Sequence, residues 1–132
     1  GPQLDFSTAP GKWTVRQIVC HLLDSELVAC MRFRRVIAED NPTLPAYDQD
    51  AWATNLRYEQ RKLSPTMELF RKLRKTNYEL LHDLPEEAFA RPAIHSETGP
   101  LTLLGLVKSY ASHVENHARQ IQEVRRLYKE SK

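Results

Sequence analysis

The sequence is poor in cysteine and in long apolar runs, and both absences exclude classes of protein. Its only two cysteines are Cys20 and Cys30, which one continuous helix would separate by about 15 Å, too far for a disulfide. No signal peptide is visible, and no apolar run approaches the ~18 residues of a membrane span. Unpaired thiols in such a sequence lead us to expect a protein of the reducing cytoplasm.

The sequence also lacks a strong excess of charge of one sign. It holds 19 basic and 17 acidic residues, for a formal net charge of +2. A balanced charge does not attract nucleic acid or an anionic membrane, and no nucleic-acid recognition motif is visible. Basic clusters at 32–35, 71–75 and 125–126 fall inside amphipathic helical patterns, so we interpret them as solvated faces. We expect neither nucleic acid nor a membrane as a partner.

What is present fits one helix-rich domain. With 132 residues, 41% of them hydrophobic and 27% charged, the chain has the size and composition of a single globular domain. We take residues 1–132 as that domain, with residues 1–12 as an N-terminal extension. Gly1-Pro2 resembles a protease-cleavage scar, in which case the natural start lies upstream.

The first predicted long helix begins at a well-marked cap. Thr14 and Gln17 match a capping box, and Trp13 with Ile18 matches the hydrophobic staple across it. Apolar residues then recur at helical spacing until Asn41-Pro42 ends the helix. A short helix from about Asp48 to Tyr58 follows, with Asp48 as its cap and Trp52 as its anchor.

Two further long helices complete the prediction. The second begins at Ser64-Pro65, with Ser64 as cap, and ends at Leu84-Pro85. Its predicted buried face consists of Met67, Phe70, Leu73, Leu80 and Leu81. After a helical turn at 86–90 and a loop with Pro92, Gly99 and Pro100, the third runs from about Thr102, its cap, to Tyr128. No alternating strand pattern is visible. We therefore expect an all-α helical bundle of three long helices plus short connecting helices.

The third long helix carries the clearest candidate chemistry. His113 and His117 lie one turn apart on the side of Leu106, Tyr110 and Ile121, so both imidazoles face the core. Their Cβ atoms should lie about 5–6 Å apart, which suits two ligands of one ion. His21, at the edge of the buried stripe of the first helix, offers a third. Such histidine pairs also occur by chance as hydrogen-bonded core residues, and spacing alone leaves both interpretations open.

Four segments resemble a known family, in the order in which that family has them. They are Gly11–Glu26 (GKWTVRQIVCHLLDSE), Tyr47–Trp52 (YDQDAW), Gly99–Leu103 (GPLTL) and His113–Ile121 (HVENHARQI). Together they are similar to the DinB superfamily of metal-dependent enzymes. The resemblance implies a four-helix bundle with a nickel or zinc ion, held by one histidine of an early helix and two of the last. Those positions match His21, His113 and His117.

The resemblance also has one departure. Members of the family usually carry another helix before the tryptophan segment, whereas this sequence begins a dozen residues upstream of Trp13. Either that helix was removed, or a neighbouring chain takes its place. Three long helices leave an apolar groove, which favours association, so we expect a homodimer or higher homo-oligomer.

Further residues are candidates for catalysis or for support of the ligands. Glu26 could act as a general base or orient an imidazole, or serve only as a salt-bridge partner. Asp50 could reach the open side of the metal, Tyr110 could contact a substrate, and Gln120 could line the site; packing explains the last two equally. Other residues with weaker claims are His82, expected to interact with a helix dipole, His95, which could approach the site from its loop, and Cys20, expected to pack as a small apolar residue.

The predicted function is that of a metal-dependent enzyme acting on a small molecule. The ion would act as a Lewis acid and lower the pKa of a bound water or thiol. The family resemblance implies either a thiol-dependent transferase, with a low-molecular-weight bacterial thiol as co-substrate, or a hydrolase. The alternative is a non-catalytic metal-binding or stress-associated interaction protein.

Overall fold

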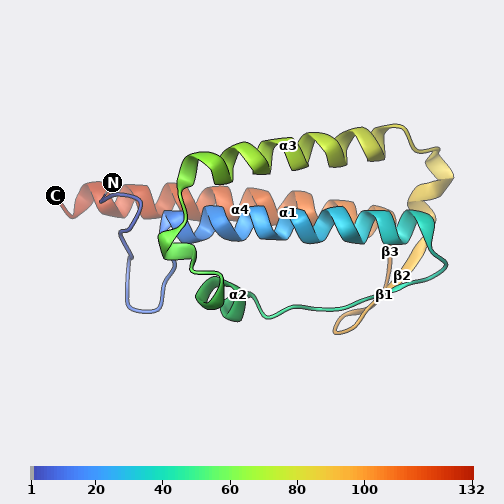
Figure 1. Ribbon diagram of the computed structural model, residues 1–132, viewed down its shortest axis with the longest axis horizontal. Coiled ribbons are helices and arrows are strands. Elements are labelled where there is room, and N and C mark those ends of the chain that lie inside the picture. Colours follow the sequence, from blue (N-terminus) through green and yellow to red (C-terminus); the bar gives the residue numbers. More distant parts are fainter. Residues whose placement is uncertain (1) are drawn as a thin grey trace.

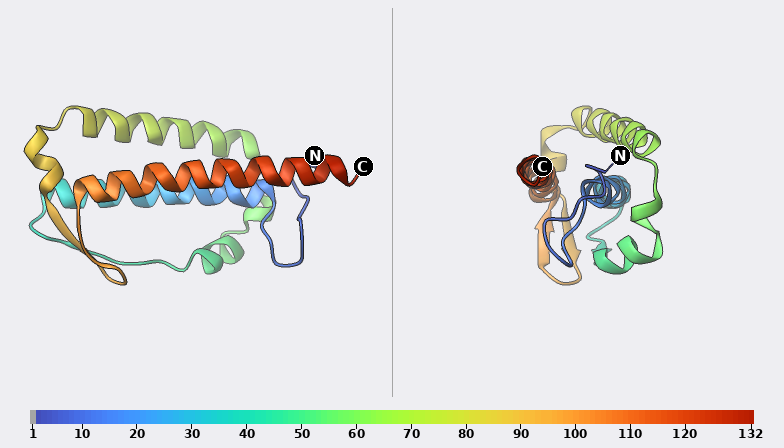
Figure 2. Two further views of the ribbon diagram at one scale, coloured as in Figure 1. Left: turned by 180° about the vertical axis from the view of Figure 1, so that it is seen from behind. Right: turned by 90° about the vertical axis from the view of Figure 1, so that its left-hand side faces the viewer.

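Three long helices lie side by side and form most of the molecule (Figure 1). A computed structural model describes residues 2–132, so Gly1 of the suspected cleavage scar lies outside the described residues. The long helices are α1 (Val15–Ala38), α3 (Leu63–His82) and α4 (Leu103–Glu130). Seen end-on, α1 lies between the other two and packs against both (Figure 2). The predicted helical bundle is confirmed.

Helix α1 is fixed at its start by the predicted capping box. Thr14 Oγ1 accepts a hydrogen bond from the backbone N–H of Gln17, and Gln17 Oε1 accepts one from the backbone N–H of Thr14. Trp13 packs against the buried cluster that contains Ile18. The cap therefore satisfies two otherwise orphaned N–H groups and fixes the direction in which α1 leaves the loop.

Replacing Thr14 by alanine should lower the free energy of unfolding by about 1 kcal/mol, because the N–H of Gln17 loses its acceptor. Urea denaturation followed by circular dichroism measures the change. Gln17→Ala removes the reciprocal bond and should cost less, since that side chain makes only the second contact. An unchanged midpoint for Thr14→Ala would show that the capping box contributes nothing to stability.

The second part of the chain departs from the prediction at two helix boundaries. Helix α2 covers only Gln49–Asn55, capped by Asp48 as expected. It ends there because Arg57 adopts a left-handed backbone (φ 54°), and a 3-10 helix, η1 (Tyr58–Gln60), follows. Helix α3 starts at Leu63 without a side-chain cap, so the prediction of Ser64 as its cap is wrong. Ser64 instead lies in the first turn.

Helix α3 is also less buried than its apolar stripe predicted. Its only fully buried residues are Thr66 and Asn77, whereas the predicted core residues Met67, Phe70 and Leu73 are half-buried. The reason is geometric, because α3 packs mainly on α1. Its flank that faces away from α1 stays open.

A small sheet at one end of the bundle was not predicted. It consists of β1 (Thr43–Leu44), β2 (Pro92–His95) and β3 (Gly99–Thr102), in that order. Strand β2 pairs parallel to β1 and antiparallel to β3, and η2 (Glu86–Ala90) precedes it at the predicted turn. Strands of two to four residues are too short to show an alternating pattern, and Pro92 and Pro100 argued against strands.

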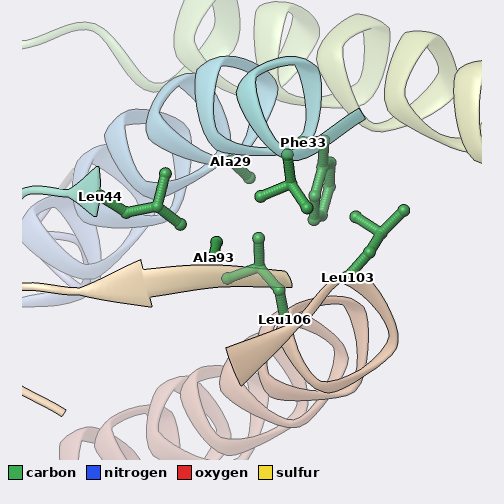
Figure 3. Close-up of a cluster of buried hydrophobic side chains, with 7 residues drawn as sticks. Ala29, Phe33, Leu44, Ala93, Leu103 and Leu106 are labelled. Carbon is green, nitrogen blue, oxygen red and sulfur yellow. The ribbon is translucent and has the colours of Figure 1, made fainter. Parts of the chain in front are cut away.

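The sheet completes the larger hydrophobic core. Figure 3 shows side chains of α1, α4 and two strands meeting in one cluster. Its buried residues are Ala29, Phe33, Val36, Leu44, Ala93, Leu103 and Leu106. This cluster fixes the separation of α1 and α4 at one end. Thr102 caps α4 as predicted, because its Oγ1 accepts a hydrogen bond from the backbone N–H of Gly105. The two helices are thereby held in the register that determines which of their side chains meet.

Candidate metal centre

Three imidazoles meet between α1 and α4. The Nε2 atom of His113 lies 3.1 Å from Nε2 of His21 and 3.0 Å from Nε2 of His117. The three candidate ligand atoms all lie within 4.8 Å of one another. His21 comes from α1 and the other two from successive turns of α4, so the helix pairing brings together residues that are far apart in the sequence.

The surroundings favour the neutral form of two of these imidazoles, those of His21 and His113. His21 is only 1% exposed, and burial, with the neighbouring His117 and His113, lowers its pKa to about 4. Burial and His117 also lower the pKa of His113. Since only a neutral imidazole offers a lone pair to a metal, both rings are ready to act as ligands near neutral pH.

The donor set fits a divalent transition metal. The Nδ1 atom of His117 lies 2.8 Å from Oε1 of Gln120. An amide oxygen only accepts, so the proton of His117 is held on Nδ1 and its Nε2 lone pair points toward the other two imidazoles. Three convergent imidazole nitrogens are a ligand set for zinc or nickel that leaves at least one coordination position free.

Packing sets the orientation of His21. The Trp13 ring lies against it, with ring centroids 5.0 Å apart. The buried Nδ1 atoms of His21 and His113 have no hydrogen-bond partner among residues 2–132. At Nδ1 these two rings are thus held by packing alone, whereas Nδ1 of His117 contacts Gln120.

A pocket opens directly beside the triad. Its volume is about 430 Å³, and its lining residues are Ser25, Arg32, Tyr47, Gln49, His95, Thr98, Leu101, Gly105, Leu106, Ser109, Tyr110 and His113. Ser25 Oγ lies 3.4 Å from His21 Nε2 and 3.0 Å from Tyr47 Oη. The pocket thus leads from the edge of the triad along α1 and α4 toward the sheet, with room for a small molecule.

The other predicted site residues are distributed unevenly around this pocket. Tyr110 lines it, and Gln120 contacts His117. Asp50 is exposed in the first turn of α2 and is not among the lining residues. The structure therefore brings Tyr110 and Gln120 to the candidate site and leaves Asp50 outside it.

Glu26 is buried, but it faces α3 instead of the triad. Its Oε2 accepts a 2.6 Å hydrogen bond from Nδ2 of Asn77, and Oε1 lies 3.4 Å from Nη1 of Arg74. Only 3% of Glu26 is exposed, so these two partners offset the cost of burying its carboxylate. Of the two roles considered for this carboxylate, the contacts favour the salt-bridge partner.

Replacing Asn77 by alanine should lower the free energy of unfolding by about 2 kcal/mol, because the buried carboxylate of Glu26 loses its shortest hydrogen bond. Urea denaturation measures the change. The matched control is Thr76→Ala, an exposed neighbour on the same helix, which should change stability by a few tenths of a kcal/mol at most. Equal effects of both substitutions would contradict a special role for the Glu26–Asn77 pair.

The remaining titratable candidates have separate positions. Cys20 is buried, with its Sγ 3.7 Å from the carbonyl oxygen of Tyr58, and burial raises its pKa to about 11, as befits a packed thiol. His82 is the exposed last residue of α3. His95 lines the pocket and accepts hydrogen bonds at Nδ1 from the backbone N–H groups of Glu97 and Thr98. His95, the last residue of β2, thus lies at the pocket, and its predicted approach to the three histidines stays a prediction.

Among the residues that line the pocket, sequence reasoning missed Ser25, Arg32 and Tyr47, whose polar side chains face it. Arg32 belongs to a basic cluster interpreted as a solvated face, and for this residue that interpretation is wrong. Its guanidinium donates to Tyr110 Oη and to the carbonyl oxygen of Pro45. The spacing of His21, Ser25 and Arg32, four and then seven residues, places them along one face of a helix and was the available signal.

The fold and this site define a helical-bundle protein with a histidine triad open to a pocket. Comparison with known proteins identifies the family, because residues 2–121 match the model of the DinB superfamily. The chain belongs to the DinB superfamily, as the sequence motifs indicated.

Individual relatives agree with this assignment. A protein of Oceanobacillus iheyensis named "Putative metal-dependent hydrolase" is 34% identical over 119 residues, covering 90% of this chain and 69% of the relative. One of Bacillus cereus with the same name is 32% identical over 124 residues, covering 94% and 71%. Relatives of this chain are thus described as metal-dependent.

A solved structure is also similar. YfiT from Bacillus subtilis, described as "a probable metal-dependent hydrolase with an unusual four-helix bundle topology", superposes with a TM-score of 0.91 at 31% identity, covering 97% of this chain and 74% of that chain.

Among residues 2–132, no helix has the length and hydropathy that a membrane crossing requires.

Proposed function

We propose that the protein is a metal-dependent enzyme in which His21, His113 and His117 bind one divalent transition metal, nickel or zinc. The observation that carries this proposal is the convergence of three Nε2 atoms within 4.8 Å at the edge of a 430 Å³ pocket. A structural metal site is normally closed by four protein ligands, whereas a catalytic one keeps an open position. Three ligands beside a pocket favour catalysis over a purely structural role.

The side chains around the triad have separate tasks in this proposal. A bound ion supplies Lewis acidity, which lowers the pKa of a coordinated water or thiol. Gln120 holds His117 in the ligand tautomer through the 2.8 Å contact at Nδ1. Ser25 and Tyr47, joined by a hydrogen bond, offer hydroxyl groups to a substrate next to His21.

Two reaction classes suit such a site. The names of the relatives favour a hydrolase acting on a small molecule. A thiol-dependent transferase, with a low-molecular-weight thiol as co-substrate, uses the same ability to stabilise an anion near neutral pH. Both reactions need a small substrate beside the triad, and the pocket provides that space.

The first experiment measures the metal in protein purified without an affinity tag. We expect about one ion per chain by mass spectrometry. The nickel-loaded protein should also speed the relaxation of solvent protons, because the open coordination position holds an exchangeable water. A coordinatively closed ion would favour the non-catalytic, metal-binding alternative. The absence of any nickel or zinc affinity would overturn the proposal.

The second experiment separates the two reaction classes. Bacillithiol, mycothiol and glutathione are each tested with an electrophile, and ester and amide substrates are tested without thiol. Metal-free protein prepared with a chelator is the control in every assay. Turnover that requires both metal and thiol identifies a transferase, and turnover that requires metal and water alone identifies a hydrolase.

We also propose a homodimer or higher homo-oligomer. Leu27 and Met31, one turn apart on α1, are 43% and 61% exposed, and they line a second, largely apolar pocket with Trp52 and Leu44. Exposed apolar side chains that gather in this way favour association. Sedimentation velocity measures the state directly, and a single monomeric species at high concentration would contradict it.

A further inference from the structure

The guanidinium of Arg32 lies in the pocket with its orientation fixed by neutral partners. Its Nη1 donates to Tyr110 Oη at 3.1 Å, and its Nη2 donates to the carbonyl oxygen of Pro45 at 2.9 Å. Both partners are uncharged acceptors, and they leave the other N–H groups of the fork unused. The side chain is therefore held in place without its charge being neutralised.

No carboxylate compensates this charge within the described part of the chain. Among residues 2–132, no carboxylate oxygen lies within 4.0 Å of Arg32. The residues that line the pocket include neither aspartate nor glutamate, and Arg32 is their only lysine or arginine. A half-buried cation without a counter-ion favours an anion in the space beside it.

The position of Arg32 relative to the triad sets the size of that anion. From Ser25, which contacts His21, to Arg32, α1 rises about 10 Å. On the facing helix, Tyr110 lies one turn before His113, and both line the same pocket. A molecule that reaches from the triad to the guanidinium is thus a small, extended one.

We propose that this pocket binds a small molecule with a carboxylate group, which Arg32 recognises while the reacting end of the molecule lies at the triad. The proposal rests on the proposed function for the reacting end. A planar guanidinium fork matches a carboxylate in bidentate geometry. One permanent cation also matches a single negative charge, whereas a phosphate dianion would need further compensation. Arg32 is accordingly a specificity-determining residue.

The test compares two thiols of equal length on cobalt-loaded protein. Mercaptohexanoate and mercaptohexanol each anchor a thiol at the metal, and the thiolate-to-cobalt absorption band reports binding. We expect the wild type to bind mercaptohexanoate roughly ten- to a hundredfold more tightly, as hydrogen bonds to a charged group provide. Arg32→Gln should lose this preference and bind mercaptohexanol as the wild type does.

Arg35→Gln is the matched control. Arg35 lies one turn further along α1, donates to the carbonyl oxygen of Thr43 and is not among the residues lining this pocket. It should retain the full preference for the carboxylate. Arg32→Lys should retain part of it, because the charge remains while the fork is lost. Thermal unfolding of each variant checks that it is folded.

The outcomes are distinct for the two proposals. Equal binding of both thiols by the wild type, or an undiminished preference in a folded Arg32→Gln, would overturn the carboxylate site. Tighter binding of mercaptohexylphosphonate than of mercaptohexanoate would overturn the choice of carboxylate as ligand. If Arg32→Gln does not fold, hexanoate and its methyl ester are compared as competitors of mercaptohexanoate for the wild type. Equal competition by the two compounds would overturn the proposal.

Failure of the metal centre would be seen separately, as an absence of cobalt uptake. Calorimetric titration of metal-free protein with hexanoate then still tests Arg32. Binding that Arg32→Gln abolishes would support the carboxylate site, and no binding by the wild type would overturn it.

Discussion

Replacing His117 by alanine should abolish stoichiometric metal binding. Two imidazoles remain in this variant, and a two-ligand site holds a divalent ion far more weakly than the triad does. Among residues 2–132, no cysteine, aspartate or glutamate joins the histidine cluster, so no neighbour can replace the lost ligand. The metal content, measured by mass spectrometry after dialysis against metal-free buffer, should fall from about one ion per chain to a small fraction.

Two further variants make this result specific to the triad. His82→Ala removes an exposed imidazole at the end of α3 and should leave the metal content unchanged. Gln120→Ala removes the partner of His117 Nδ1 and should weaken binding about 10- to 100-fold without abolishing it, as expected for a residue that orients a ligand. Full occupancy in a folded His117→Ala protein would refute the ligand assignment.

The meeting of the three histidines could be predicted because two independent patterns agree. Helical spacing puts His113 and His117 on one face of α4, and the apolar residues beside them show that this face is buried. The position of His21 on the facing helix required the family resemblance, because periodicity does not determine which turns of two helices come together. That register depends on the core around Phe33 and Leu103.

The sheet and the position of Arg32 could not be predicted for a related reason. Thr43–Leu44 pairs with Ile94–His95, which lie 51 residues later in the sequence, and strands this short carry no pattern of their own. Arg32 is held by the carbonyl oxygen of Pro45, which follows β1, and by Tyr110 of α4. An arginine inside a basic cluster differs from its neighbours only through such long-range contacts, which a local pattern does not contain.

The second large effect should be on stability, because a metal that binds only the folded triad stabilises the folded protein. At a free metal concentration of about a thousand times Kd, the free energy of unfolding should rise by roughly 4 kcal/mol. For a domain of this size, that corresponds to an increase in Tm of roughly 12–20 °C. Calorimetry of metal-free protein with added zinc or nickel, and again after a chelator is added, measures this shift and its reversal.

The triad variant separates this effect from weak binding elsewhere on the surface. His117→Ala should show almost no increase in Tm with the same metal, although its fold is otherwise supported by cores that do not include the histidines. An equal shift in the variant would mean that the ion binds at another site. A wild-type protein whose Tm does not respond to zinc or nickel would contradict a metal-binding triad, since three convergent Nε2 atoms exist as a site only in the folded chain.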